Sequence, residues 1–118
     1  MALWAAEFNA NGRLIGFIGL AVPSWLPEVL PAVEVGWRLH PDHWGQGLAT
    51  EGGRASLEYG FDRIGLDRII SIYEPGNVAS GRVMEKLGMR PWRRTTDPER
   101  GNLLAIYEAT RPGWAASS

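Results

Sequence analysis

The stretch VEVGWRLHPDHWGQGLATEGGRASLEYGF, residues 33–61, decides how this chain is expected to fold. Its first seven residues alternate, with one face made by Val33, Val35, Trp37 and Leu39 and the other by Glu34, Gly36 and Arg38. Strict alternation is the period of a β-strand, so Glu34 is expected to project its carboxylate from a strand. After the glycine-rich turn, the pattern predicts an amphipathic helix whose apolar stripe consists of Leu48, Gly52, Ala55 and Tyr59.

The turn between this strand and this helix has the chemistry of an anion site. The first N–H groups of a helix lack intrahelical partners, and that end carries about half a positive charge. Gly45 and Gly47 would let a pyrophosphate approach the backbone without meeting a Cβ atom. The spacing equally allows two glycines that only make a tight turn, and both readings stay open.

Two other nucleotide motifs fit this turn less well. A dinucleotide fingerprint requires a third glycine where Thr50 stands and an acidic residue after the next strand, a place that Glu74 fills only approximately. The Gly-Lys-Ser/Thr sequence of nucleoside triphosphate loops is absent. The sequence therefore weakens the first alternative and excludes the second.

The segments before residue 33 predict a hairpin and a loop. Asn9 to Gly12 form a turn sequence between β-rich segments at 3–8 and 13–20. Residues 21–32 contain three prolines, which predicts an irregular loop. Trp25 and Leu26 are expected to fold back from it onto the domain.

The segments after residue 61 complete the sheet. A β-branched run at 69–73 predicts a strand, and a helix follows between the N-cap Asn77 and a C-terminal glycine, Gly88. Segments 89–96 and 102–108 predict a closing hairpin. The order βββαβαββ indicates an α+β fold with a mixed, mostly antiparallel sheet flanked by helices.

Composition narrows the class of protein further. The chain has 118 residues, a net charge of -1 and no cysteine, which predicts one domain over 1–112 with a flexible tail at 113–118. The near-neutral charge disfavours nucleic acid, and no apolar run approaches the roughly 20 residues of a membrane helix. The expected location is cytoplasmic. His40 and His43, with Asp42 between them, could suggest a metal site. Two histidines three residues apart in a proline-containing loop carry no third-ligand signal, so no metal is expected.

Residues 33–61, together with RIISIYEPGNVASGRVMEKLGM at 68–89, resemble the GNAT superfamily of acetyl-CoA-dependent N-acetyltransferases. The resemblance covers residues 3–108 and is greatest to the ribosomal-protein-alanine N-acetyltransferase branch. Trp44 stands where the family motif has Arg or Gln. Against the family pattern the chain starts at the second strand, which implies an N-terminally truncated GNAT-like fold and an exposed edge that a homodimer would cover.

The resemblance assigns roles to individual residues. It implies Glu34 as general base and Ser80 as the acid for the departing thiolate, while Asn77 contacts the pantetheine arm and Lys86 reaches the adenosine end. The implied backbone contacts to pantetheine come from Trp37, Arg38 and Leu39, and those to pyrophosphate from Trp44, Gly45, Gln46, Gly47, Leu48, Ala49 and Thr50. Each side chain also has a structural alternative: Glu34 as a strand partner of Arg38, Asn77 as a cap, and Ser80 as a first-turn hydroxyl.

The expected activity is direct transfer of acetyl from acetyl-CoA to a primary amine, either a peptide or protein N-terminus or a small amine, in a ternary complex. An α-amine with a pKa of about 8 is roughly a tenth neutral at pH 7, whereas lysine is neutral at well under a thousandth. An N-terminal amine therefore needs less help from the general base to lose its proton. The alternatives are a coenzyme-A-binding module without turnover and a structural or dimerisation domain.

Overall fold

The computed structural model of the chain describes residues 2–8, 14–39 and 47–111. In chain order the elements are β1 (Ala2–Phe8), β2 (Leu14–Ala21), the 3₁₀ turn η1 (Pro27–Val29), β3 (Glu34–Leu39), α1 (Leu48–Glu58), the π-helical turn η3 (Tyr59–Ile64), β4 (Arg68–Tyr73), α2 (Val78–Lys86), β5 (Arg90–Thr96) and β6 (Leu103–Thr110). The predicted order of strands and helices is confirmed. The expected hairpin turn at 9–12 and the tail at 113–118 lie outside the described residues.

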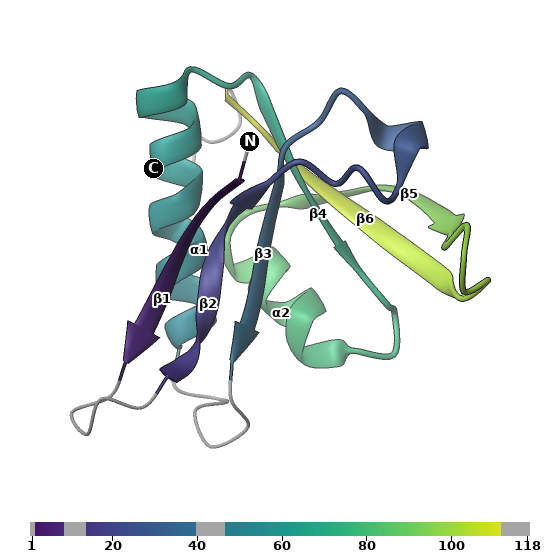
Figure 1. The fold of residues 1–118 in the computed structure, drawn as a ribbon, viewed down its shortest axis with the longest axis horizontal. Helices are drawn as coiled ribbons and strands as arrows, with labels where there is room; N and C mark the ends of the chain where they lie inside the picture. Colours follow the sequence, from purple (N-terminus) through teal and green to yellow (C-terminus); the bar gives the residue numbers. More distant parts are fainter. Residues whose placement is uncertain (1, 9–13, 40–46, 112–118) are drawn as a thin grey trace.

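The six strands form one sheet in the order β1-β2-β3-β4-β6-β5. Only β3 and β4 run parallel, and the other neighbours are antiparallel, so the mixed, mostly antiparallel sheet is confirmed. Within the described strands, the ladder between β3 and β4 consists of one residue pair, Glu34 with Ile70. Both strands continue beyond this pair, and Figure 1 shows them diverging. The sheet is therefore split at its centre.

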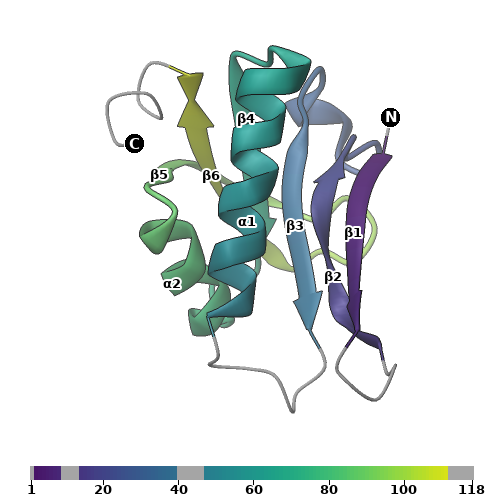
Figure 2. The ribbon, with the colours of Figure 1, turned by 90° about the vertical axis from the view of Figure 1, so that its left-hand side faces the viewer.

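Different segments cover the two faces of the sheet. Helices α1 and α2 lie together on one face (Figure 2), over a core that includes Val35, Leu57 and Met84. On the opposite face, Leu26 and Val29 from the proline-containing loop pack against β4 and β6 at Ile70 and Ile106. Each face thus has its own apolar cluster.

One of the two expectations for the loop at 22–32, that Leu26 and Trp25 fold back onto the domain, is confirmed. Leu26 is 1% exposed and folds back onto the sheet as expected. Trp25 is 44% exposed, so the expectation that it also folds back is wrong. The 3₁₀ turn that begins at Pro27 buries Leu26 and Val29 and leaves the neighbouring Trp25 at the surface.

The apolar stripe predicted for α1 is also wrong. Ala55 is exposed and Tyr59 is 47% exposed, whereas the buried stripe includes Gly53, Leu57 and Phe61. The cause is close packing, because a Cβ atom at Gly53 would lie 2.8 Å from Cδ1 of Leu87 in the turn that ends α2. Only glycine fits without a shift of Leu87 at this close approach, and a count of apolar side chains overlooks it.

Both ends of α2 form as the sequence predicts. The Asn77 side chain accepts a hydrogen bond from the backbone N–H of Ser80 at 3.2 Å, which caps the helix. Gly88 adopts a φ of 77° just after the helix, in the left-handed region that ends many helices. These two signals fix where α2 starts, and so place Ser80 in its first turn.

Candidate active site

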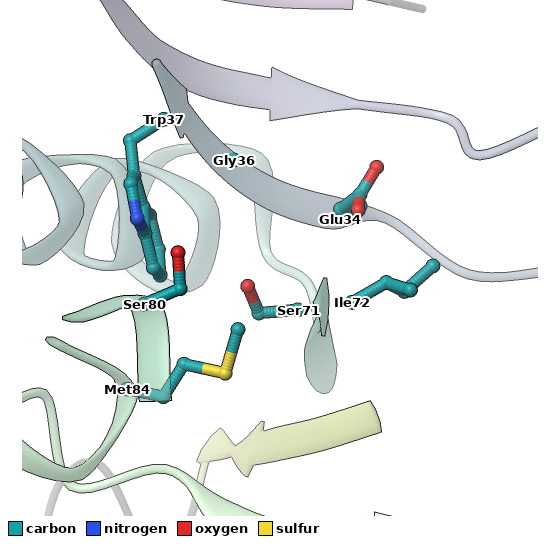
Figure 3. A pocket seen from close by; sticks show the side chains of 7 residues that line it. All are labelled: Glu34, Gly36, Trp37, Ser71, Ile72, Ser80 and Met84. Atoms are coloured by element: carbon teal, nitrogen blue, oxygen red, sulfur yellow. The ribbon is translucent and has the colours of Figure 1, made fainter. Parts of the chain in front are cut away.

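A cavity of about 210 Å³ opens where β3 and β4 separate. It is smaller than the roughly 300–1,000 Å³ typical of pockets that enclose a whole ligand, so its size suits the end of a longer molecule. Figure 3 shows the seven residues that line it: Glu34, Gly36, Trp37, Ser71, Ile72, Ser80 and Met84. The cavity therefore joins two strands of the split sheet to the first turns of α2.

The lining residues come from both faces of the sheet. Trp37 and Met84 belong to the cluster under the helices, whereas Ile72 packs against the cluster on the opposite face. Glu34 pairs with Ile70, which belongs to that opposite cluster, and alternation puts Gly36 on the same face as Glu34. Two reactants could thus meet in this cavity from opposite sides of the sheet.

Glu34 occupies an unusual environment for a carboxylate. Partial burial raises its pKa from 4.5 to about 7, although the backbone N–H of Ile72 donates a hydrogen bond that opposes this rise. A carboxyl group with a pKa near neutrality binds and releases a proton at physiological pH, which suits a general base. Shifts of a side-chain pKa of this kind are common at functional sites.

The raised pKa predicts a stability effect of Glu34→Gln. Because the folded protein holds the proton more tightly than the unfolded chain, stability falls as the pH rises from about 4.5 to 7 and stays lower above that range. Glutamine carries no charge to bury, so the variant should exceed the wild type in free energy of unfolding by about 1–3 kcal/mol at pH 8. Urea unfolding at pH 8 and pH 4.5 measures this, and a gain of the same size at both pH values would contradict it.

Ser71 holds the two strands together at the start of the split. Its side chain is 2% exposed, and its hydroxyl donates a hydrogen bond of 2.9 Å to the carbonyl oxygen of Val35. The carbonyl of Val33 also faces β4, where it accepts from the N–H of Ile70 at 2.9 Å. Backbone groups alternate along a strand, so the N–H and C=O of Trp37 face the same gap. Beyond Val35, β3 thus presents backbone groups on a side where β4 no longer pairs with it.

Ser80 lies in the first turn of α2 and lines the cavity. Figure 3 shows its hydroxyl, together with that of Ser71, at the cavity. Its backbone N–H is bound by Asn77 Oδ1, which leaves its hydroxyl for the cavity. The cap occupies only the oxygen of the Asn77 amide, so its NH₂ group is compatible with a second, ligand-binding role. Asn77 itself does not line the cavity.

The described part of the glycine-rich turn is the start of α1. Gly47 has a φ of 75° and its carbonyl accepts from the N–H of Glu51 at 3.0 Å, so the helix begins at Leu48. The N–H groups of Leu48, Ala49 and Thr50 therefore belong to the first turn, which has no intrahelical acceptors for them. The predicted pyrophosphate contacts at Trp44, Gly45 and Gln46 lie outside the described residues.

The structure thus brings together three of the predicted site residues, Glu34, Trp37 and Ser80. Arg38 and Leu39 continue the backbone of β3 beyond Trp37. Lys86 is exposed in the last turn of α2, away from the cavity lining, and its carbonyl accepts from Arg54 at 3.3 Å. Sequence reasoning missed four lining residues: Gly36, Ser71, Ile72 and Met84.

The described residues contain neither a metal-binding cluster nor a membrane-spanning helix. No group of three or more His, Asp or Glu side chains within residues 2–8, 14–39 and 47–111 could hold a metal ion. His40, Asp42 and His43 lie outside those residues. In the same part of the chain, no helix has the length and apolar character needed to cross a membrane.

Comparison with known proteins identifies the family. Residues 1–90 match the family model described as an acetyltransferase (GNAT) domain. The FsC-acetyl coenzyme A-N(2)-transacetylase of Aspergillus fumigatus is 41% identical in an alignment 97 residues long, which covers 72% of this chain and 41% of that protein. A GNAT-family acetyltransferase structure from Bacillus anthracis matches with a TM-score of 0.71 and 30% identity, over 87% of this chain and 62% of that one.

The predicted branch also has a structural match. The ribosomal-protein-S5-alanine acetyltransferase from Vibrio fischeri superposes with a TM-score of 0.80 over 96% of this chain and 63% of that one, and its 19% identity shows a shared fold. Three relatives from Bacillus subtilis are likewise longer, since the chain spans 34–60% of their length. The family model covers most of the chain, and the Bacillus anthracis structure agrees with it: the chain belongs to the GNAT family of acetyltransferases.

Proposed function

We propose that this chain transfers acetyl from acetyl-CoA to a primary amine, and that Glu34 and Ser80 carry out the proton transfers. One observation carries the proposal: a single cavity contains a carboxylate with a raised pKa and a helix hydroxyl, at the point where β3 loses its partner strand. GNAT membership supplies the reaction class. The residue roles are our assignment.

The proposed cofactor site uses backbone groups more than side chains. Pantetheine is an extended amide chain, and it would pair with β3 from Trp37 to Leu39 in the gap that β4 leaves open. The pyrophosphate would lie at the start of α1, on residues 44–50, where N–H groups and the helix dipole favour anions. The NH₂ group of Asn77 would bind the pantetheine arm, and Lys86 would approach the adenosine end. No metal takes part in this proposal.

The proposed reaction is a direct attack within a ternary complex. The amine nitrogen forms a bond with the thioester carbonyl carbon, and its proton passes to the Glu34 carboxylate. The N–H of Trp37, which faces the gap, is the proposed donor to the oxyanion. When the carbon–sulfur bond breaks, the Ser80 hydroxyl gives its proton to the departing thiolate and takes one back from solvent. Glu34 then releases the amine proton to solvent, so both side chains return to their starting states. Holding the two reactants together contributes most of the rate.

The proposed acceptor is an amine that is partly neutral at physiological pH. An α-amine has a pKa of about 8, so a base with a pKa near 7 can remove its proton with little cost. A peptide or protein N-terminus fits best on this ground, and small amines fit as well. The name of the Aspergillus relative, which specifies an N(2) position, agrees with transfer to an amine nitrogen.

We also propose that two copies of the chain associate. Val22, Trp25 and Leu30 expose apolar surface on the loop that crosses the sheet face bearing Glu34, and β1 is an edge strand. A second copy would cover this surface. We further propose that the chain acts in the cytoplasm, as expected from its sequence.

The proposal is tested by binding and turnover with acetyl-CoA. At a concentration 100 times its dissociation constant, acetyl-CoA should raise the free energy of unfolding by about 2.7 kcal/mol. Thiol release should then depend on, and saturate with, an amine such as alaninamide or an N-terminal peptide. Binding without thiol release for any amine would favour a coenzyme-A-binding module, and no binding would favour a structural domain.

A further inference from the structure

Gly36 differs from the other lining residues because it contributes space instead of a side chain. It lines the cavity, yet a Cβ atom at this position would meet no heavy atom of the described residues within 4 Å. Its cross-strand partner on β2 is Gly19, so the position directly opposite also lacks a side chain. Among the described side chains, none fills the space beside Gly36, which borders the cavity.

This open volume lies on the amine side of the proposed reaction. Alternation along β3 places Gly36 on the same sheet face as Glu34, two residues away, and Glu34 must contact the amine to take its proton. Trp37, Ser80 and Met84 lie toward the helices, where the departing sulfur would be. Added bulk at residue 36 would consequently reach the substituents of the amine before it reached the thioester.

We infer that Gly36 determines acceptor specificity: by leaving space beside Glu34, it admits primary amines branched at the carbon that bears the nitrogen. This inference rests on the proposed function and adds the shape of its substrate. In every L-amino acid except glycine, the α-carbon carries a side chain beside the amine. The site is thus open to N-termini and amino acid derivatives with such a branch, and an alanine at residue 36 would fill the space that the branch needs.

The test uses Gly36→Ala with coenzyme A conjugates, in which an acetyl linker joins the sulfur to the amine nitrogen of glycinamide or valinamide. Calorimetry should find that wild type binds both conjugates with dissociation constants within tenfold of each other. Gly36→Ala should weaken the valinamide conjugate at least tenfold more than the glycinamide conjugate, because one extra carbon in a fitted pocket changes selectivity by about 10- to 200-fold. Affinity for acetyl-CoA should stay within twofold. The ratio of kcat/KM for glycinamide and valinamide gives the same readout in turnover.

The control is Gly76→Ala, which also adds a methyl group in open space but lies outside the cavity lining. It should leave the ratio of the two conjugates unchanged. Equal weakening of both conjugates by Gly36→Ala would overturn the inference alone, and so would a wild type that already excludes the valinamide conjugate. A variant that changes only the preference between propionyl-CoA and acetyl-CoA would also overturn it, because residue 36 would then contact the acyl group and not the amine. Failure of wild type to bind acetyl-CoA would overturn the proposed function, and the inference with it. Gly36→Ala should fold normally, because the new methyl group has no atom of the described residues within 4 Å.

Discussion

Glu34→Gln is expected to lower kcat by about 10²- to 10⁴-fold while the dissociation constant of acetyl-CoA stays within about threefold. A positioned general base contributes a factor of this size, and glutamine keeps the shape of the side chain without its ability to take a proton. Cofactor affinity should persist because the proposed contacts to pantetheine and pyrophosphate come from the backbone of β3 and the start of α1. Steady-state thiol release and calorimetry measure the two quantities separately.

The pH dependence distinguishes a base from a residue that only shapes the cavity. With an acceptor whose own amine pKa lies well below 7, wild-type kcat/KM should rise with pH and level off above about pH 7, where Glu34 is ionised. Glu34→Gln should abolish this rise. Glu58→Gln, which removes an exposed carboxylate from α1, is the matched control and should behave as wild type. A wild-type profile that is flat across pH 6–8 would remove Glu34 from the base role.

The sequence predicted those parts of the fold that depend on local patterns. The alternation at 33–39 gave β3, and the Asn77 cap with Gly88 gave the limits of α2, because strands and caps have short-range signals. The separation of β3 from β4 has no such signal. It depends on which residues pair across two strands that have residues 40–67 between them. One pair, Glu34 with Ile70, is all that forms within the described strands.

The site was predicted only in part, because it too depends on residues that lie far apart in the sequence. Glu34 and Ser80 were found through a resemblance that spans both motifs, and their convergence on one cavity could not be derived from either motif alone. Ser71 did carry a usable signal: it interrupts the otherwise apolar run IISI at 69–72, and a serine buried in a strand needs a hydrogen-bond partner. Gly36 carried none, because a glycine on the polar face of a strand looks the same whether it borders solvent or a cavity.

Glu34→Gln should have opposite consequences for catalysis and for stability. The environment that brings its pKa close to the working pH also destabilises the folded protein above pH 7, where the carboxylate is charged and partly buried. A residue whose removal stabilises the fold while turnover falls is retained for its chemistry. The alternative role, a strand carboxylate paired with Arg38, predicts the reverse sign, since loss of a favourable pair lowers stability.

Ser80→Ala is expected to lower kcat by about 10- to 100-fold, less than the loss for Glu34→Gln. A thiol has a pKa of about 8.5, so the thiolate of coenzyme A leaves readily near neutral pH and needs less help than the amine. The backbone N–H of Ser80, which Asn77 binds, is retained in the alanine variant, so α2 should keep its cap. Kinetics with saturating acetyl-CoA measure the loss, and Ser80→Thr should recover part of it because the hydroxyl returns.

Two serines face the cavity, and their surroundings predict different results. The Ser71 hydroxyl already donates a hydrogen bond to the carbonyl oxygen of Val35, so Ser71→Ala should lower stability by about 1–3 kcal/mol because that carbonyl loses its partner. Ser80 lies in the first turn of α2, where the positive end of the helix dipole favours a developing thiolate. Ser56→Ala removes a hydroxyl that bonds Gly52 within α1 and serves as the control with unchanged kcat. If Ser80→Ala turns over at the wild-type rate while Glu34→Gln does not, the proton reaches the thiolate from solvent, and the Ser80 hydroxyl has only a structural role in the first turn of α2.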